Sequence, residues 1–310
     1  VFQQNRTESA VVFQGRQHYG ENCLSGRTAV RCLITGAEGL LGSALSKVLA
    51  HQGIEYRALA KFDLDVTDRS ATKHCIGVEN PDVVFHCAAL TDVDGAESVR
   101  NASFAVNAGG TTNVAEACKA VGSRMVYFST DYIFDGTKRT PYSPNDEPGP
   151  LSAYGESKLA GEHIAAASGV DLLLVRTSWL YGSVGKNFVR GVIRRAREGR
   201  ALRLVDDQTG SPTWAEHVAE LTLDLVNHCA SGTYHVTNSG EATWYDLGRE
   251  ALSICSLPNE IEPISTEDWG APAPRPRYSV LDSSKVEALL GRKMTPWREA
   301  LKKFLKDMPR

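Results

Sequence analysis

The sequence predicts an α/β protein built on a doubly wound parallel sheet. Short apolar runs of strand length alternate along the chain with longer stretches in which apolar residues recur at helical spacing. The strand-length runs are apolar at nearly every position, which is typical of strands covered on both faces by helices.

The first predicted strand covers residues 30–34, a short apolar run that ends at a glycine-rich turn. Residues 39–52 follow with Leu41, Leu45 and Leu49 at helical spacing, which predicts an amphipathic helix. The same reasoning predicts further strands at 54–60, 82–88, 125–128 and 172–175, and further helices at 106–121 and 152–167.

Composition excludes several classes of protein. The chain has 310 residues, of which 42% are hydrophobic, so it can bury a sizeable core. A formal net charge of −3 and the lack of a basic patch with interleaved aromatic residues argue against nucleic acid as a partner. No apolar run reaches the roughly 18–20 residues of a membrane span. Residues 1–29 are polar and aperiodic, and we interpret them as an N-terminal extension outside the functional unit.

The seven cysteines are scattered and form no CxxC pair. This argues against a disulfide framework and against a zinc site, so no metal ligand is predicted. It favours a reducing, cytoplasmic setting.

A glycine-rich motif, GxxGxxG at Gly36, Gly39 and Gly42, lies between the first predicted strand and helix. Glycine permits close approach of a pyrophosphate to the backbone, and the amino end of a helix offers free N–H groups to phosphate oxygens. A Gly-rich turn alone is common, but its position between a strand and a helix favours nucleotide binding.

The second predicted strand does not end in the acidic residue that usually holds the ribose 2′-hydroxyl of NAD. Arg57 or Lys61 could instead accept the 2′-phosphate of NADPH, and the alternative is that both are solvated surface charges. Asp65 follows in an acidic loop, where a carboxylate could accept from the adenine amino group or cap the next helix. The cofactor is therefore predicted as NADPH or NADH.

The motif YxxxK at Tyr154 and Lys158 is the strongest indication of catalysis. Residues four apart share one face of a helix, and an adjacent ammonium lowers the pKa of a phenol. Such a tyrosine can protonate a carbonyl oxygen while hydride reaches its carbon. The alternative is a half-buried tyrosine beside a solvated lysine.

Thr130 and Asp131 follow the strand predicted at 125–128. The carboxyl ends of parallel strands face the ligand crevice, so a hydroxyl there can donate to a substrate carbonyl. Alternatively, both side chains satisfy local backbone groups in a loop.

Nine motifs together resemble the dTDP-4-dehydrorhamnose reductase family, which consists of extended short-chain dehydrogenases acting on nucleotide sugars. The similarity runs in order from about Arg31 to about Ala300 through GAEGLLG, HCAALTDVDGAES, FAVNAGGTTNVAEA, STDYIFDG, AYGESKLAGE, RTSWLYG, DDQTGSPTWA, GTYHVTN and RPRYS.

The resemblance implies roles for individual residues. The catalytic residues would be Thr130, Tyr154 and Lys158. The same tyrosine and lysine would contact the cofactor, together with Gly36, Gly39, Leu40, Leu41, Asp65, Val66, Ala88, Ala89, Leu90 and Thr91. The substrate would contact Thr130, Asp131, Tyr132, Trp179, Asn187 and Arg275, with Arg277 as an alternative for the diphosphate.

The resemblance also implies an architecture. A Rossmann lobe of residues 30–177 plus 213–237 would be joined by a smaller α/β substrate-binding lobe of residues 178–212 plus 238–310, with the substrate between them. Within the Rossmann lobe, the resemblance implies a helix at 213–227 and a strand at 232–237. Some members bind Mg²⁺ at an acidic dimer surface. No such carboxylate set is matched here, so Mg²⁺ and a homodimer stay open.

The sequence thus predicts NAD(P)H-dependent reduction of the C4 keto group of a dTDP-4-keto-6-deoxyhexose, from dTDP-4-dehydrorhamnose to dTDP-L-rhamnose. Two alternatives remain. One is a reductase, epimerase or dehydratase for another nucleotide sugar on the same fold. The other is a non-catalytic regulatory subunit. The segment around His86 departs from the usual family pattern, and we expect this histidine to be a packed strand residue rather than a base.

Overall fold

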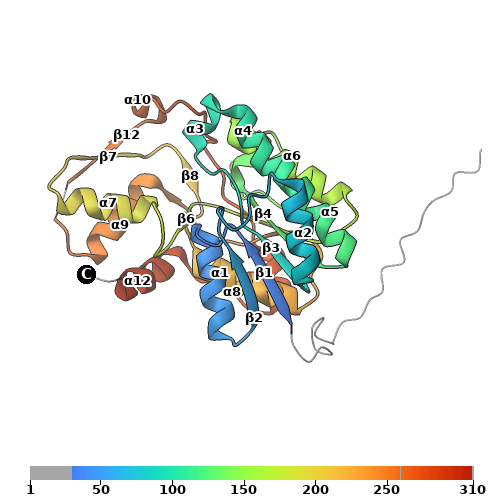
Figure 1. Ribbon diagram of the computed structural model, residues 1–310. Coiled ribbons are helices and arrows are strands. Elements are labelled where there is room, and N and C mark those ends of the chain that lie inside the picture. Colours follow the sequence, from blue (N-terminus) through green and yellow to red (C-terminus); the bar gives the residue numbers. More distant parts are fainter. Residues whose placement is uncertain (1–29, 259, 309–310) are drawn as a thin grey trace, which may run out of the picture.

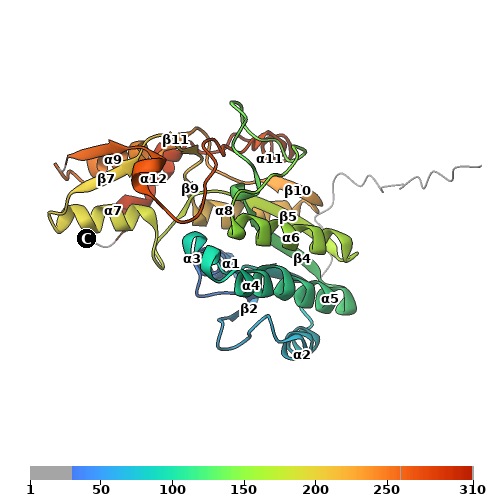
Figure 2. The same cartoon turned by 90° about the horizontal axis from the view of Figure 1, so that it is seen from above.

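The computed structural model describes residues 30–258 and 260–308; the predicted extension, 1–29, lies outside them. A six-stranded parallel sheet has the order β10-β5-β4-β3-β1-β2 (Figures 1 and 2). Its strands are β1 (Arg31–Thr35), β2 (Glu55–Leu59), β3 (Val83–His86), β4 (Arg124–Thr130), β5 (Asp171–Thr177) and β10 (Gly232–His235).

Helices cover both faces of this sheet, which confirms the doubly wound α/β prediction. One face packs against α1 (Leu40–His51) and α8 (Ala215–Asn227). The other packs against α2 (Arg69–Glu79), α5 (Thr111–Val121) and α6 (Ala153–Ala167) (Figures 1 and 2). Short helical segments complete this part of the chain: α3 (Val93–Ser98), α4 (Arg100–Phe104), η1 (Ala105–Gly110) and η2 (Asp131–Ile133).

Strand β4 shows why the predicted strands do not alternate between apolar and polar residues. All seven of its residues are buried. Val126 packs on the α1 and α8 side, whereas Met125 and Tyr127 pack on the α2 and α5 side. Because successive side chains point to opposite faces, a strand between two helical layers must be apolar on both. Each fully buried aliphatic side chain contributes about 1.5–3 kcal/mol.

A second group of elements packs around Trp297, which is almost completely buried. Figure 2 shows α7, α9, α12 and β7 gathered on one side of the molecule. Its helices are α7 (Phe188–Arg197), α9 (Trp244–Ile254) and α12 (Trp297–Asp307), whereas the short helix α10 (Thr266–Trp269) contributes no residue to the Trp297 cluster. Its strands pair as β6 (Leu180–Tyr181) with β9 (Thr213–Trp214), β7 (Leu202–Val205) with β12 (Ile261–Ile264), and β8 (Thr209–Gly210) with β11 (Ala242–Thr243).

The chain returns to the large sheet near its end. Helix α11 (Ser284–Leu290) packs against β10 and α8, and its Val286 joins the hydrophobic cluster of α1 and α8 together with Met294. The core beside the large sheet therefore contains residues from within 238–310, the stretch that the sequence assigned to the substrate lobe.

Two of the predicted helices do not begin as α-helices at the expected residue. The stretch 106–121 starts as the π-helix η1 and becomes α-helical only at Thr111. The side chain of Asn107 lies in that widened turn and bonds outside the helix, which apolar periodicity cannot reveal. The stretch 213–227 starts as β9, because Thr213 and Trp214 pair with β6, and its helix begins at Ala215.

Among the described residues, five cysteines carry free thiols, namely Cys32, Cys75, Cys87, Cys118 and Cys255, whereas Cys229 is disulfide-bonded. Spacing in the sequence does not show which cysteines a fold brings together, and a single bond at Cys229 is not the disulfide framework that the sequence argued against. Within residues 30–258 and 260–308, no helix is long and apolar enough to cross a membrane.

Candidate active site

The glycine-rich motif forms the tight turn between β1 and α1. Gly36 has φ +67°, and a Cβ there would lie 2.7 Å from backbone atoms of Ala88. A Cβ on Gly42 would lie 2.4 Å from the Gly36 carbonyl oxygen. Helix α1 begins at Leu40 without a side-chain cap. The turn therefore needs glycine, and it leaves helix N–H groups for phosphate oxygens.

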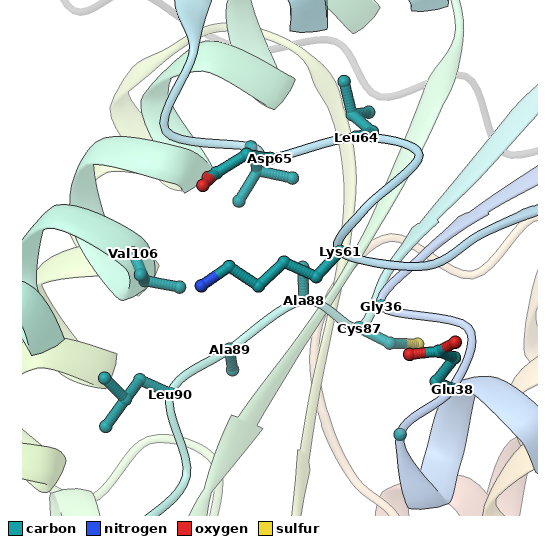
Figure 3. Close-up of a pocket in the computed structure, with 12 residues that line it drawn as sticks. Gly36, Glu38, Lys61, Leu64, Asp65, Cys87, Ala88, Ala89, Leu90 and Val106 are labelled. Atoms are coloured by element: carbon teal, nitrogen blue, oxygen red, sulfur yellow. The ribbon is translucent and has the colours of Figure 1, made fainter.

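A cavity of about 380 Å³ lies beside this turn (Figure 3). It contains the residues expected around adenine and its ribose, including Asp65 and Val66. The lining residues are Gly36, Glu38, Gly39, Lys61, Leu64, Asp65, Val66, Cys87, Ala88, Ala89, Leu90 and Val106. This shape and donor set fit a dinucleotide.

The structure separates the two cations considered for a 2′-phosphate. Lys61 lines the cavity, and Figure 3 shows its side chain extending into the cavity in the direction of Val106. Arg57 belongs to β2, and its guanidinium lies 3.7 Å from the carboxylate of Glu79. Of the two cations, Lys61 alone lines this cavity.

A second cavity, of about 430 Å³, continues from the first through Gly39, Cys87 and Ala89, which line both. It brings together Thr130, Tyr154 and Lys158. Its other lining residues are Leu40, Leu41, Gly42, Thr91, Val93, Phe128, Ser129, Asp131, Thr177, Ser178, Trp179, Leu180, Tyr181, Lys186, Phe188, Val189, Trp244 and Leu247. All ten residues expected to bind the cofactor besides Tyr154 and Lys158 line one cavity or both.

Helix α6 positions Tyr154 and Lys158 in its first turns. The Ser152 hydroxyl accepts a hydrogen bond from Gly155 N and so caps the helix. A Cβ on Gly155 would lie 2.2 Å from the Tyr132 carbonyl oxygen, so glycine allows the helix to approach the end of β4. The Lys158 ammonium lies 4.3 Å from the ring centre of Tyr127.

Burial dominates the pKa of both groups. Burial raises the pKa of Tyr154 to about 12, and a hydrogen bond with Thr130 opposes this rise. Burial lowers the pKa of Lys158 to about 8, and Glu162 opposes the fall. Lys158 is not among the groups that shift the pKa of Tyr154 here, so the lowering expected from the lysine stays a prediction.

Asp131 lies buried at the end of β4. Its Oδ1 accepts from the Thr130 hydroxyl at 3.1 Å, and its Oδ2 accepts from the Ser279 hydroxyl at 2.6 Å. Thr130 also accepts from Tyr132 N at 3.2 Å. Burial raises the pKa of Asp131 to about 7. Ser279 was not predicted, since it comes from 148 residues further along the chain.

Asn107 links Leu90, in the loop that follows β3, to Ser157 on helix α6. Its Oδ1 accepts from Leu90 N at 2.8 Å, and its Nδ2 donates to Leu90 O at 3.0 Å and to Ser157 Oγ at 2.9 Å. His86 is buried between the hydroxyls of Thr35 and Thr111, and burial lowers its pKa to about 3. It is a packed strand residue, as expected.

Two indoles form a wall of the second cavity. Trp179 and Trp244 stack with ring centres 3.6 Å apart and planes within 4°. Trp179 has φ +47°, uncommon for a residue with a side chain. A Cβ on Gly210 would lie 2.4 Å from the Trp179 ring, so glycine in DDQTGSPTWA makes room for the indole.

Three residues expected at the substrate lie apart from both sets of lining residues. Tyr132 packs edge-on against Tyr154. Asn187 caps α7 and donates to the Gly182 carbonyl oxygen. Arg275 forms a two-pronged ion pair with Asp94, with N–O distances of 3.0 and 2.9 Å.

Four residues that line the second cavity also carry a buried side-chain polar atom with no hydrogen-bond partner within the described residues. They are Ser129, Thr177, Trp179 and Tyr181. Of these, sequence reasoning had singled out Trp179 alone. It also missed Trp244 and Lys186, whose place on the wall depends on segments far apart in the chain.

Comparison with known proteins gives consistent results. Residues 30–310 match the family model described as RmlD substrate binding domain. A dTDP-4-dehydrorhamnose reductase from Mycobacterium tuberculosis is 42% identical over 90% of this chain and 93% of its own. A dTDP-4-keto-6-deoxy-D-glucose reductase from Streptomyces niveus is 39% identical over 81% and 88%. The crystal structure of a dTDP-4-dehydrorhamnose reductase from Bacillus anthracis in complex with NADP has a TM-score of 0.88 at 37% identity, covering 90% of this chain and all of that one.

Proposed function

The chain belongs to the dTDP-4-dehydrorhamnose reductase family, and from this membership we propose that it reduces the C4 keto group of a dTDP-4-keto-6-deoxyhexose with NAD(P)H, converting dTDP-4-dehydrorhamnose to dTDP-L-rhamnose. It is an oxidoreductase. The observation that carries the proposal is one cavity that contains Thr130, Tyr154 and Lys158 and continues into the cavity beside the glycine-rich turn.

The residues present fit the cofactor. The Gly36 turn leaves room for a backbone approach, and Lys61 offers a cation in the first cavity. When bound, NAD(P)H supplies the hydride that reduces the carbonyl carbon.

Tyr154 then donates its phenolic proton to the C4 oxygen as negative charge develops there. Lys158, four residues further along α6, stabilises the phenolate that remains. Thr130 holds the keto oxygen by a hydrogen bond. The Trp179 indole offers an apolar face to the deoxyhexose ring.

The test is an absorbance assay for NAD(P)H at 340 nm with purified protein. NADH and NADPH are offered in parallel with dTDP-4-keto-6-deoxyhexoses that differ at C3 and C5, with and without Mg²⁺. Oxidation of the cofactor with one ketosugar supports the proposal. Conversion of the sugar without net oxidation would identify an epimerase or dehydratase. No turnover of any ketosugar would favour a regulatory subunit.

Cytoplasmic location and a homodimer belong to the same proposal. The free thiols of Cys32 and Cys118 suit a reducing compartment, whereas the bond at Cys229 does not. Cell fractionation and sedimentation equilibrium test the two parts separately.

A further inference from the structure

The nucleotide sugar of the proposed function carries a negatively charged diphosphate, which the protein has to bind. This inference rests on that function, because it concerns the nucleoside diphosphate of the sugar. A diphosphate bears at least two negative charges near neutral pH, and proteins hold such groups with cations or N–H donors. The charged residues lining the second cavity are Asp131, Lys158 and Lys186.

Only one of these three side chains is available to a diphosphate. Asp131 accepts hydrogen bonds from two hydroxyls and would repel an anion when ionised. Lys158 is buried on α6 beside the Tyr127 ring, in the turn after Tyr154. Lys186 is exposed, and no carboxylate of the described residues forms an ion pair with it.

The segment that carries Lys186 is held in place by the helix that follows it. Asn187 Nδ2 donates to Gly182 O at 2.9 Å, and Asn187 Oδ1 accepts from Arg190 N at 3.2 Å. The Arg190 guanidinium donates to Ser183 O at 2.7 Å and to Gly185 O at 3.3 Å. These bonds fix the backbone on both sides of Lys186. Binding of a ligand to its ammonium therefore costs little more conformational entropy than that of the Lys186 side chain.

The arginines expected to bind the diphosphate are placed elsewhere. Arg275 is committed to Asp94, and neither it nor Arg277 lines either cavity. Aromatic side chains at Phe188 and Trp244, in contrast, line the second cavity together with Lys186.

We propose that Lys186 binds the diphosphate of the nucleotide sugar at the rim of the second cavity, and that Asn187 and Arg190 are the positioning residues of its segment. The interaction is charge-assisted and partly exposed, so it weakens as salt screens it.

Binding of dTDP to the protein saturated with NADP⁺ tests this, measured by isothermal titration calorimetry. Lys186→Met keeps the apolar stem and removes the charge, and we expect it to raise the Kd for dTDP about tenfold. Lys186→Arg should retain most of the affinity. Lys302→Met, on the exposed face of α12, is the matched control and should bind dTDP as the original protein does.

Two further readouts separate binding of phosphate from a structural effect. The loss in Lys186→Met should shrink from dTDP to dTMP and vanish for thymidine. The salt dependence of the dTDP Kd should be less steep in Lys186→Met than in the original protein. An unchanged dTDP affinity, or an equal loss for thymidine, would overturn the inference.

Failure of the proposed function gives a different result. If the protein binds dTDP through Lys186 but oxidises no cofactor with any ketosugar, the reductase assignment fails and the binding inference stands. If ketosugar turnover is normal while Lys186→Met leaves dTDP affinity unchanged, the inference fails and the reductase assignment stands.

Discussion

The hydroxyl group of Thr130 donates its hydrogen bond to Asp131 Oδ1 at 3.1 Å. A hydroxyl has one proton to donate, so this bond competes with donation to a substrate keto oxygen. When Asp131 is protonated it can donate to Thr130 instead, and the Thr130 proton is free to point into the cavity. Because burial raises the pKa of Asp131 to about 7, both arrangements exist near neutral pH.

Asp131→Asn should change how stability depends on pH. A carboxyl with a raised folded-state pKa binds its proton more tightly in the folded protein. The free energy of unfolding therefore falls as pH rises from about 4 to about 7, by up to roughly 1.4 kcal/mol per pH unit, and this contribution is constant above that window. The variant cannot ionise and should lack this fall. Urea unfolding at pH 5 and pH 8 measures it, and parallel losses in both proteins would contradict the assignment.

Tyr154→Phe should lower kcat by about 10²- to 10⁴-fold, because the phenolic proton is lost while the ring and its packing remain. The Kd for NADPH should change little. Single-turnover absorbance and cofactor fluorescence measure the two quantities. A variant with normal turnover would remove Tyr154 from the chemistry.

Lys61→Met should weaken binding of NADPH by about tenfold and leave NADH nearly unaffected, because a cation in the first cavity recognises the 2′-phosphate. Arg57→Met is the matched control, since Arg57 lies by Glu79 and outside both sets of lining residues. Cofactor fluorescence titration gives all Kd values. Equal losses for both cofactors would argue against 2′-phosphate recognition.

Asn107→Ala should destabilise the protein by about 2–4 kcal/mol, because it leaves the backbone N–H and C=O of Leu90 without this partner. It should also lower kcat more than it raises the KM for the sugar, since Leu90 and Ser157 are no longer tied together. Urea unfolding and steady-state kinetics test the two effects. Rescue of both by Asn107→Asp would be unexpected, because a carboxylate cannot donate to Leu90 O.

Local patterns predicted what depends on neighbouring residues. The order of strands and helices followed from apolar periodicity, and the glycine turn followed from its place between a strand and a helix. Tyr154 and Lys158 were predictable because a spacing of four places two side chains on one helix face.

Contacts between distant segments could not be predicted. Ser279 reaches Asp131 across 148 residues, and Arg275 reaches Asp94 across 181. For this reason the sequence could not show that Arg275, in its Pro-rich loop, forms an ion pair with Asp94 and is not available to a phosphate. Asn187 was singled out as a polar residue near the substrate; the structure shows that it caps α7, and its contact with the substrate stays a prediction.

The route of the chain through the large sheet has a practical consequence. The edge strand β10 and the covering helix α8 follow α7 and β7 in the chain, and Val286 of the same core comes later still. A fragment that stops after β5 would expose an unpaired strand edge and the apolar face that α8 covers. Such a fragment should aggregate on expression, so a single cut cannot yield the part around the large sheet as a separate stable protein.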